Sequence, residues 1–212
     1  MNIVGPDALI FGVDDVEACK QFLLDYGLVD AGNGRFEALD GTAVIIAERD
    51  DSSLPPALET GSMLRKTVYG VADQETLDAI AEELGKDREV SKLDDGSLET
   101  VDDLGFVLGF QVTVRKKLSL PAVKTNLPGS SDQRPINDVA VSKEAQPKPV
   151  SLSHVVYFVP DFAKGEAFYT ERLGFVTTDR FTNVGPFMRP AGTQDHHTMF
   201  MIQTPPHMQG CE

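Results

Sequence analysis

The 212-residue sequence lacks tryptophan and has only two cysteines, Cys19 and Cys211. Two cysteines are too few for a disulfide framework, and they lack the paired spacing of a zinc site. No apolar run approaches the roughly 20 residues that span a bilayer, and the first residues lack the basic and then apolar order of a signal peptide. We therefore expect a cytoplasmic protein that makes no membrane contact.

Positive charge is also scarce. Lysine and arginine total 19 against 33 aspartates and glutamates, which gives a formal net charge of -14. Such a surface repels the phosphates of nucleic acids and of anionic membranes. Small molecules and other proteins remain as partners, and the hydrophobic share of 41% is that of an ordinary globular chain.

Histidine is absent from the first 150 residues, and all four histidines lie after them. They are His154, His196, His197 and His207. Imidazole is the side chain that most readily serves both as a metal ligand and as an acid or base near neutral pH. Any chemistry of this kind is therefore expected after residue 150.

An internal repeat sets the architecture. Val13, Asp15, Glu17, Phe22 and Gly27 recur 58 residues later as Val71, Asp73, Glu75, Ile80 and Gly85. A shift of 146 residues from the first copy gives Val159, Asp161, Phe168 and, after one inserted residue, Gly174. The chain therefore holds three copies of one design.

Each copy begins with an apolar strand that runs into an aspartate able to cap a helix, and short strand-like runs follow the helix. We predict helices that start near Asp15, Asp73 and Asp161. The glycines Gly27, Gly85 and Gly174 are predicted to end them in the left-handed conformation. This order predicts an α+β fold of tandem βαβββ modules.

The stretch from residue 114 to 150 differs from the modules, with five of the thirteen prolines and seven of the nineteen lysines and arginines. Its basic residues are scattered among prolines, which favours a linker over a functional basic patch. We predict an N-terminal domain of two modules at residues 1–113, a linker at 114–150 and a third module at 151–212 that forms an incomplete C-terminal domain.

The third copy resembles the vicinal oxygen chelate superfamily, which includes glyoxalases, bleomycin-resistance proteins, fosfomycin-resistance enzymes and extradiol dioxygenases. The resemblance rests on HVVYFVPD at residues 154–161, FY at 168–169, LGF at 173–175 and RPAGTQDHH at 189–197. It is closest to the type I extradiol ring-cleaving dioxygenases, which have four modules in two domains. The resemblance implies a fourth module, carrying a second histidine ligand and a glutamate, that would follow this sequence. We therefore expect a fragment of a longer protein, the alternative being a natural three-module variant.

The resemblance also implies roles for the histidines. His154, which is predicted to lie in mid-strand, matches the first metal ligand, on the open face of the third sheet, and His197 matches the catalytic acid or base. His196 is the adjacent candidate on the same predicted strand, so the two side chains are expected to point to opposite faces and at most one can face the site. Ala8 and Lys66 occupy the position of His154 in the first two copies, so we expect no metal site there. His207 is expected to be solvated.

The function implied is that of an extradiol dioxygenase, or part of one, which cleaves a catechol-like aromatic with O2 and Fe(II), Mn(II) being the possible alternative. Two alternatives stay open: a metal-free small-molecule binding protein of the bleomycin-resistance type, and a glyoxalase-type metal-dependent isomerase. We expect a homo-oligomer. Because Glu212, the last residue, is a poor substitute for a glutamate on a strand, we expect no complete metal centre in these residues.

Overall fold

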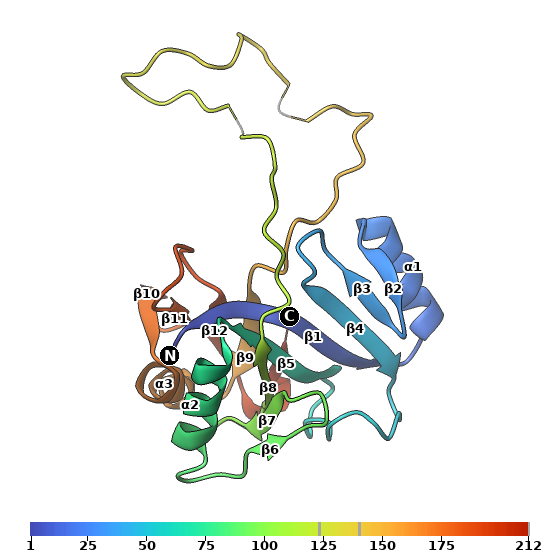
Figure 1. Cartoon of the computed structure of the whole chain (residues 1–212), viewed down its shortest axis with the longest axis vertical. Coiled ribbons are helices and arrows are strands. Elements are labelled where there is room, and N and C mark those ends of the chain that lie inside the picture. The colour runs from blue at the N-terminus through green and yellow to red at the C-terminus, as the bar shows by residue number, and fades with distance from the viewer. Residues whose placement is uncertain (123, 140, 212) are drawn as a thin grey trace.

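The computed structural model describes residues 1–122, 124–139 and 141–211, and it contains three βαβββ modules (Figure 1). The first comprises β1 (Ile3–Val13), α1 (Val16–Tyr26), β2 (Val29–Gly32), β3 (Arg35–Glu37) and β4 (Ala43–Glu48). The second comprises β5 (Leu64–Val71), α2 (Gln74–Leu84), β6 (Ser91–Lys92), β7 (Leu98–Val101) and β8 (Val107–Val112). The predicted fold class is confirmed.

The third module comprises β9 (Val155–Val159), α3 (Phe162–Ala167), β10 (Phe175–Phe181), β11 (Gly185–Pro190) and β12 (Met199–Gln203). A π-helical turn, Phe168–Arg172, continues α3. A 3-10 turn (Pro206–Met208) and a short strand, β13 (Gly210–Cys211), follow β12. The one residue inserted in this copy of the repeat thus lies close to a wider helical turn, which is the usual way an α-helix absorbs an extra residue.

Two sheets carry the modules. The first two modules share an eight-stranded sheet in the order β2-β3-β4-β1-β5-β8-β7-β6, and the third forms a five-stranded sheet in the order β10-β11-β12-β9-β13. In each module the first strand runs parallel to the last strand, as in β1 with β4, β5 with β8 and β9 with β12. β13 lies antiparallel beside β9, which is the place that β5 takes beside β1.

The three helices begin where the repeat predicts. Asp15, Asp73 and Asp161 are the N-caps, and their carboxylates accept hydrogen bonds from backbone N–H groups three residues on, at 2.9, 2.8 and 3.0 Å. Each cap satisfies a donor that the first helical turn leaves unpaired. The same local solution therefore recurs in all three modules.

The left-handed conformation predicted for the glycine at the end of each helix is present at two of the three glycines. Gly27 has φ 100° and Gly174 has φ 72°, but Gly85 has φ -63° and is right-handed. After α2 the chain continues in further turns, in which the N–H of Arg88 donates to the carbonyl of Leu84 at 3.2 Å. The chain does not reverse at Gly85, so no left-handed residue is needed there.

The buried residues form two unequal clusters. A small cluster in the first module contains Val13, Leu23, Phe36 and Ile46. A large one joins the second and third modules, and includes Tyr69 and Ile80 from the second with Tyr157 and Tyr169 from the third. Modules two and three thus share one core, although they belong to different sheets.

Residues 113–154 hold no helix or strand in the part of this stretch that the structure describes. In Figure 1 the stretch leaves the body of the protein as a long loop and returns beside the first module. Its ends are fastened there: the N–H of Val114 donates to Asp7 at 3.0 Å, and the carbonyls of Pro149 and Val150 accept from Leu39 and Asp40, each at 3.0 Å. Among the described residues, no helix is both long and apolar enough to cross a membrane.

Candidate functional site

The sheet of the third module has two chemically different faces. Met188, Met199 and Met201 are fully buried on the face toward α3. Because side chains alternate along a strand, Phe187 and Phe200 lie on the opposite face, together with Val156. All four histidines of the chain belong to this module or to its flanking turns, so we describe this second face as the candidate site.

Three phenylalanines cover part of this face and form what we call the phenylalanine cluster: Phe181, Phe187 and Phe200. The rings of Phe187 and Phe200 stack with centroids 4.0 Å apart and an interplanar angle of 9°. Phe181, 59% exposed, lies edge-on to both, at 5.3 and 5.9 Å. The cluster offers a flat apolar surface suited to another planar ring.

His154 lies at the edge of this surface. It directly precedes β9 and is exposed, so the expectation of a histidine in mid-strand is corrected by one residue. The N–H of Val155 donates to the carbonyl of Thr198 at 3.1 Å, which brings the start of β9 beside the segment that precedes β12. The imidazoles of His154 and His197 consequently lie with their centroids 4.9 Å apart.

His196 and His197 lie in the loop before β12, not on the strand itself. Their Nδ1 atoms are 3.0 Å apart and their rings are nearly perpendicular, at 89°. The expectation of opposite faces is therefore wrong, because a bend replaces the extended backbone that would separate the two side chains. His197 also packs edge-on against Phe187 at 4.9 Å.

The environment of His197 favours its neutral form. Partial burial lowers its pKa first, and the neighbouring His154 and His196 lower the pKa further, because a positive charge there would be repelled. A neutral imidazole at neutral pH can accept a proton. His196 faces a carboxylate instead, with its Nε2 atom 3.8 Å from Oδ2 of Asp179.

The donor set for a metal is incomplete in the described part of the chain, where no three His, Cys, Asp or Glu side chains converge so as to hold an ion. His154 and His197 bring two imidazoles together, but a ferrous site of two histidines and one carboxylate would still lack its carboxylate even if both served as ligands. Glu212 lies outside the described residues. In the second module the position of His154 belongs to Lys66, whose ammonium pairs with Glu99 at 2.7 Å.

A pocket of about 290 Å³ adjoins His154 on the side of the first module. Tyr26, Thr42, Leu152 and His154 are among its lining residues. The sequence signals neither this pocket nor the phenylalanine cluster, because both depend on contacts between segments far apart in the chain. His207 lies exposed in the 3-10 turn near the other end of β9 and takes no part in either.

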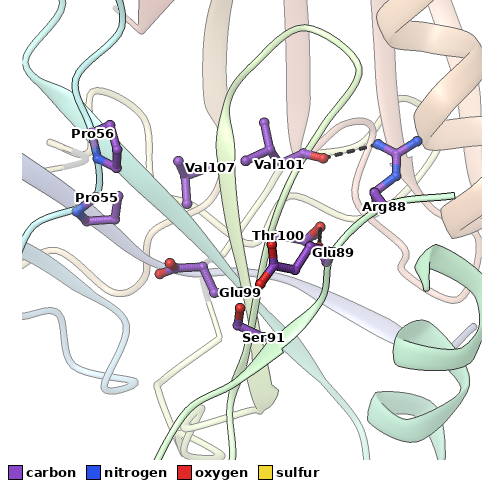
Figure 2. Close-up of a pocket in the computed structure, with 9 residues that line it drawn as sticks. All are labelled: Pro55, Pro56, Arg88, Glu89, Ser91, Glu99, Thr100, Val101 and Val107. Carbon is purple, nitrogen blue, oxygen red and sulfur yellow. Dashed lines mark hydrogen bonds between the residues drawn. The ribbon is translucent and has the colours of Figure 1, made fainter.

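A second pocket, of about 370 Å³, lies in the second module and contains no histidine (Figure 2). Its lining residues are Pro55, Pro56, Arg88, Glu89, Ser91, Glu99, Thr100, Val101 and Val107. Figure 2 shows the guanidinium of Arg88 directed to the carbonyl of Val101, a hydrogen bond of 3.1 Å. Because that guanidinium is engaged and Glu99 pairs with Lys66, few groups in this pocket are left for a ligand.

Comparisons with known proteins place the third module. Residues 151–210 match the family model described as the Glyoxalase/Bleomycin resistance protein/Dioxygenase superfamily. A search of curated proteins finds no match.

Several solved structures share the fold. A Mn(II)-bound glyoxalase from Novosphingobium aromaticivorans aligns over 96% of this chain and 63% of its own, with a TM-score of 0.66 and 18% identity. The 2,3-dioxygenase LapB from Pseudomonas sp. KL28 aligns over 97% of this chain and 72% of its own, with a TM-score of 0.64 and 18% identity. A 2,2',3-trihydroxybiphenyl 1,2-dioxygenase from Sphingomonas wittichii aligns over 98% of this chain and 71% of its own, with a TM-score of 0.61 and 21% identity.

The chain therefore spans 63% of the length of that glyoxalase. At these identities the likeness establishes the fold, and the activities of the relatives remain theirs. Residues 151–210 thus match the model of the Glyoxalase/Bleomycin resistance protein/Dioxygenase superfamily, and the chain as a whole shares its fold with the solved glyoxalase and dioxygenase structures.

Proposed function

We propose that the third module is the metal-binding and substrate-facing part of an extradiol ring-cleaving dioxygenase, which acts on a catechol-like aromatic with Fe(II) and O2. The observation that carries the proposal is the meeting of His154 and His197, with ring centroids 4.9 Å apart, at the edge of the phenylalanine cluster. The likeness of the fold to two solved dioxygenase structures, one of a 2,2',3-trihydroxybiphenyl 1,2-dioxygenase, supports it.

The residues of this chain have distinct roles in the proposal. His154 would be one ligand of a ferrous ion, and that ion would supply Lewis-acid activation of the catechol. His197, neutral because its pKa is lowered, accepts the proton of a catechol hydroxyl and later returns a proton. Phe187 and Phe200 give the aromatic ring an apolar surface and exclude water from that side.

One observation favours a second candidate, a metal-free small-molecule binding protein of the bleomycin-resistance type. Within the described residues no third donor joins the two imidazoles, whereas a pocket of about 290 Å³ lies directly beside His154. In that case His154 and Tyr26 would contact a planar ligand by stacking and hydrogen bonding, and no oxygen would be consumed.

Oxygen uptake with a panel of catechols separates the two candidates, provided that it is measured on the protein as it occurs in the cell, supplied with Fe(II), because the residues described here do not supply a complete ligand set. We expect His154→Ala and His197→Ala each to lower the rate of uptake by about 100-fold or more. His207→Ala is the matched control and should retain the rate, because His207 is exposed at the other end of β9. Uptake that survives His154→Ala contradicts the ligand assignment. Catechol binding without uptake, unaffected by removal of metal, supports the binding protein.

A further inference from the structure

We propose that Thr42 and Arg115, outside the third module, are positioning residues that fix His154 in place. This inference rests on the proposed function, in which the location of His154 matters for chemistry. Its physical basis is a set of hydrogen bonds that ends at Leu152, two residues before His154.

Leu152 is held on both sides of its backbone. Its N–H donates to Oγ1 of Thr42 at 2.6 Å, and its carbonyl accepts from a terminal nitrogen of Arg115 at 3.0 Å. Both bonds come from side chains that belong to or follow the first two modules. Since the backbone from Leu152 to His154 is only two residues long, the direction in which β9 starts depends on these contacts.

Arg115 is itself fixed. Its Nε donates to Asp7 at 3.3 Å, and the nitrogen that binds Leu152 also donates to the carbonyl of Pro6 at 2.7 Å. Asp7 is 0% exposed and accepts further hydrogen bonds from the side chain of Thr113 and the N–H of Val114. A guanidinium that shares its donors among a buried carboxylate and two carbonyls has little freedom to move.

Thr42 belongs to the same network. Its hydroxyl donates to Oδ1 of Asp40 at 2.7 Å, which leaves the hydroxyl oxygen to accept from Leu152. The other carboxylate oxygen of Asp40 lies 3.4 Å from a nitrogen of Arg115. The two side chains that hold Leu152 are thus tied together through Asp40, and Thr42 is 0% exposed.

The imidazole of His154, by contrast, makes no hydrogen bond with any described residue. Its ring lies beside that of His197, with centroids 4.9 Å apart. A ligand histidine is usually oriented by a partner on its second nitrogen. Here the orientation has to come from the backbone, and that backbone is set by Thr42 and Arg115.

A simple anchor for the linker would not require this arrangement. The linker is already fastened by backbone hydrogen bonds from Leu39 to Pro149 and from Asp40 to Val150. The contacts at Leu152 add side-chain groups closer to the histidine. They therefore act on the position of His154 more than on the attachment of the linker.

Nuclear magnetic resonance of labelled protein tests the idea without reference to turnover, because the chain has only four histidines to assign. The variants are Thr42→Val and Arg115→Lys, each of which removes a bond to Leu152 while keeping similar volume or charge. The controls are Thr100→Val, whose hydroxyl donates to the carbonyl of Glu89, and Arg49→Lys, whose guanidinium binds the exposed Asp14.

We expect the nuclear Overhauser effect between the rings of His154 and His197 to be lost in both variants and kept in both controls. The contact between Phe187 and Phe200 should persist in all four, which shows that the third module is folded. If the His154–His197 contact and the His154 shifts are unchanged in Thr42→Val and Arg115→Lys, the inference is wrong. It is equally wrong if the phenylalanine contact disappears too, because the two residues would then serve folding alone.

A kinetic measurement separates this inference from the function on which it rests. If the protein is a dioxygenase, both variants should lower kcat about 10-fold with little change in KM, as expected for a residue that acts through another. If no catechol is cleaved at all, the proposed function fails, while the resonance experiment still decides whether Thr42 and Arg115 hold His154.

Discussion

The helices α1 and α2 follow one sequence pattern, yet their equivalent apolar side chains are buried to different extents. Phe22 in α1 matches Ile80 in α2, and Tyr26 matches Leu84, each 58 residues apart. Ile80 and Leu84 are 0% exposed, whereas Phe22 and Tyr26 are 66% and 64% exposed. Equivalent apolar positions are therefore core in one module and surface in the other.

The difference comes from the third module. α2 lies beside α3 in Figure 1, and its end is bound by Arg172, which donates to Glu83 at 2.7 Å and to Asp87 at 2.8 Å. α1 has only the small cluster of its own module to pack against. Helical periodicity thus determines which residues form the apolar face, and a neighbouring module determines how much of that face is buried.

The largest effect that we expect from this comparison is on the free energy of unfolding when an equivalent apolar residue is truncated in each helix. Ile80→Ala should lower the free energy of unfolding by about 2 to 5 kcal/mol, because it opens a cavity in a packed core. Phe22→Ala should cost less than about 1 kcal/mol, since most of its ring is already in water. Chemical denaturation followed by circular dichroism measures both. Equal losses for the two variants would show that α1 is covered in solution.

The comparison also shows what the sequence could reveal. Asp15, Asp73 and Asp161 act within one turn of their own helices, so a local pattern predicted them correctly. His154 was found as a candidate by resemblance, but its position just before β9 depends on bonds to Thr42 and Arg115, distant in sequence. The stacking of Phe187 on Phe200 likewise follows from strand pairing, which no single segment encodes.

The loop before β12 shows a second limit. Adjacent residues were predicted to point to opposite faces, which is true only where the backbone is extended. His196 and His197 lie in a bend, and their Nδ1 atoms meet at 3.0 Å. The sequence pattern does not locate the first residue of a strand to within one or two positions. The relative orientation of His196 and His197 could therefore not be predicted from it.

The next effect is a dependence of stability on pH, caused by a carboxyl group in the shared core of modules two and three. Asp102 is fully buried, accepts hydrogen bonds from the N–H groups of Leu104 and Phe106, and receives the hydroxyl of Tyr169 at 3.2 Å. Burial raises its pKa to about 6 from the ordinary 3.8, although these hydrogen bonds act in the opposite direction. The folded protein therefore favours the neutral carboxyl.

The sign follows from proton binding. Between pH 4 and 6 the folded state holds a proton on Asp102 that the unfolded state has released, so stability is greatest at the low end and falls as the pH rises. The loss should be roughly 2 to 3 kcal/mol, complete just above pH 6. In Asp102→Asn this component should vanish. Parallel stability profiles of the two proteins from pH 4 to 7 would contradict the assignment.

The smallest effect concerns how closely α3 approaches the second module. Gly165 occupies the position of Cys19 in α1 and Leu77 in α2, and a Cβ there would lie 2.7 Å from Cδ1 of Leu104 and 2.8 Å from Sδ of Met201. Alanine normally stabilises a helix by about 1 kcal/mol relative to glycine. Here that gain is offset by overpacking, which costs about 1 to 3 kcal/mol in a dense core.

We therefore expect Gly165→Ala to lower the free energy of unfolding by about 1 kcal/mol, because Met201 is 0% exposed and can move only by displacing its neighbours. The control is Gly61→Ala, at an exposed position where a Cβ meets no atom within 4 Å. That variant should be more stable than the parent by up to about 1 kcal/mol, since alanine restricts the unfolded chain. Opposite signs for the two substitutions support close packing between α3 and the second module. If Gly165→Ala were stabilising as well, the third module would have room to move on the second, and the shared core would be looser than the structure shows.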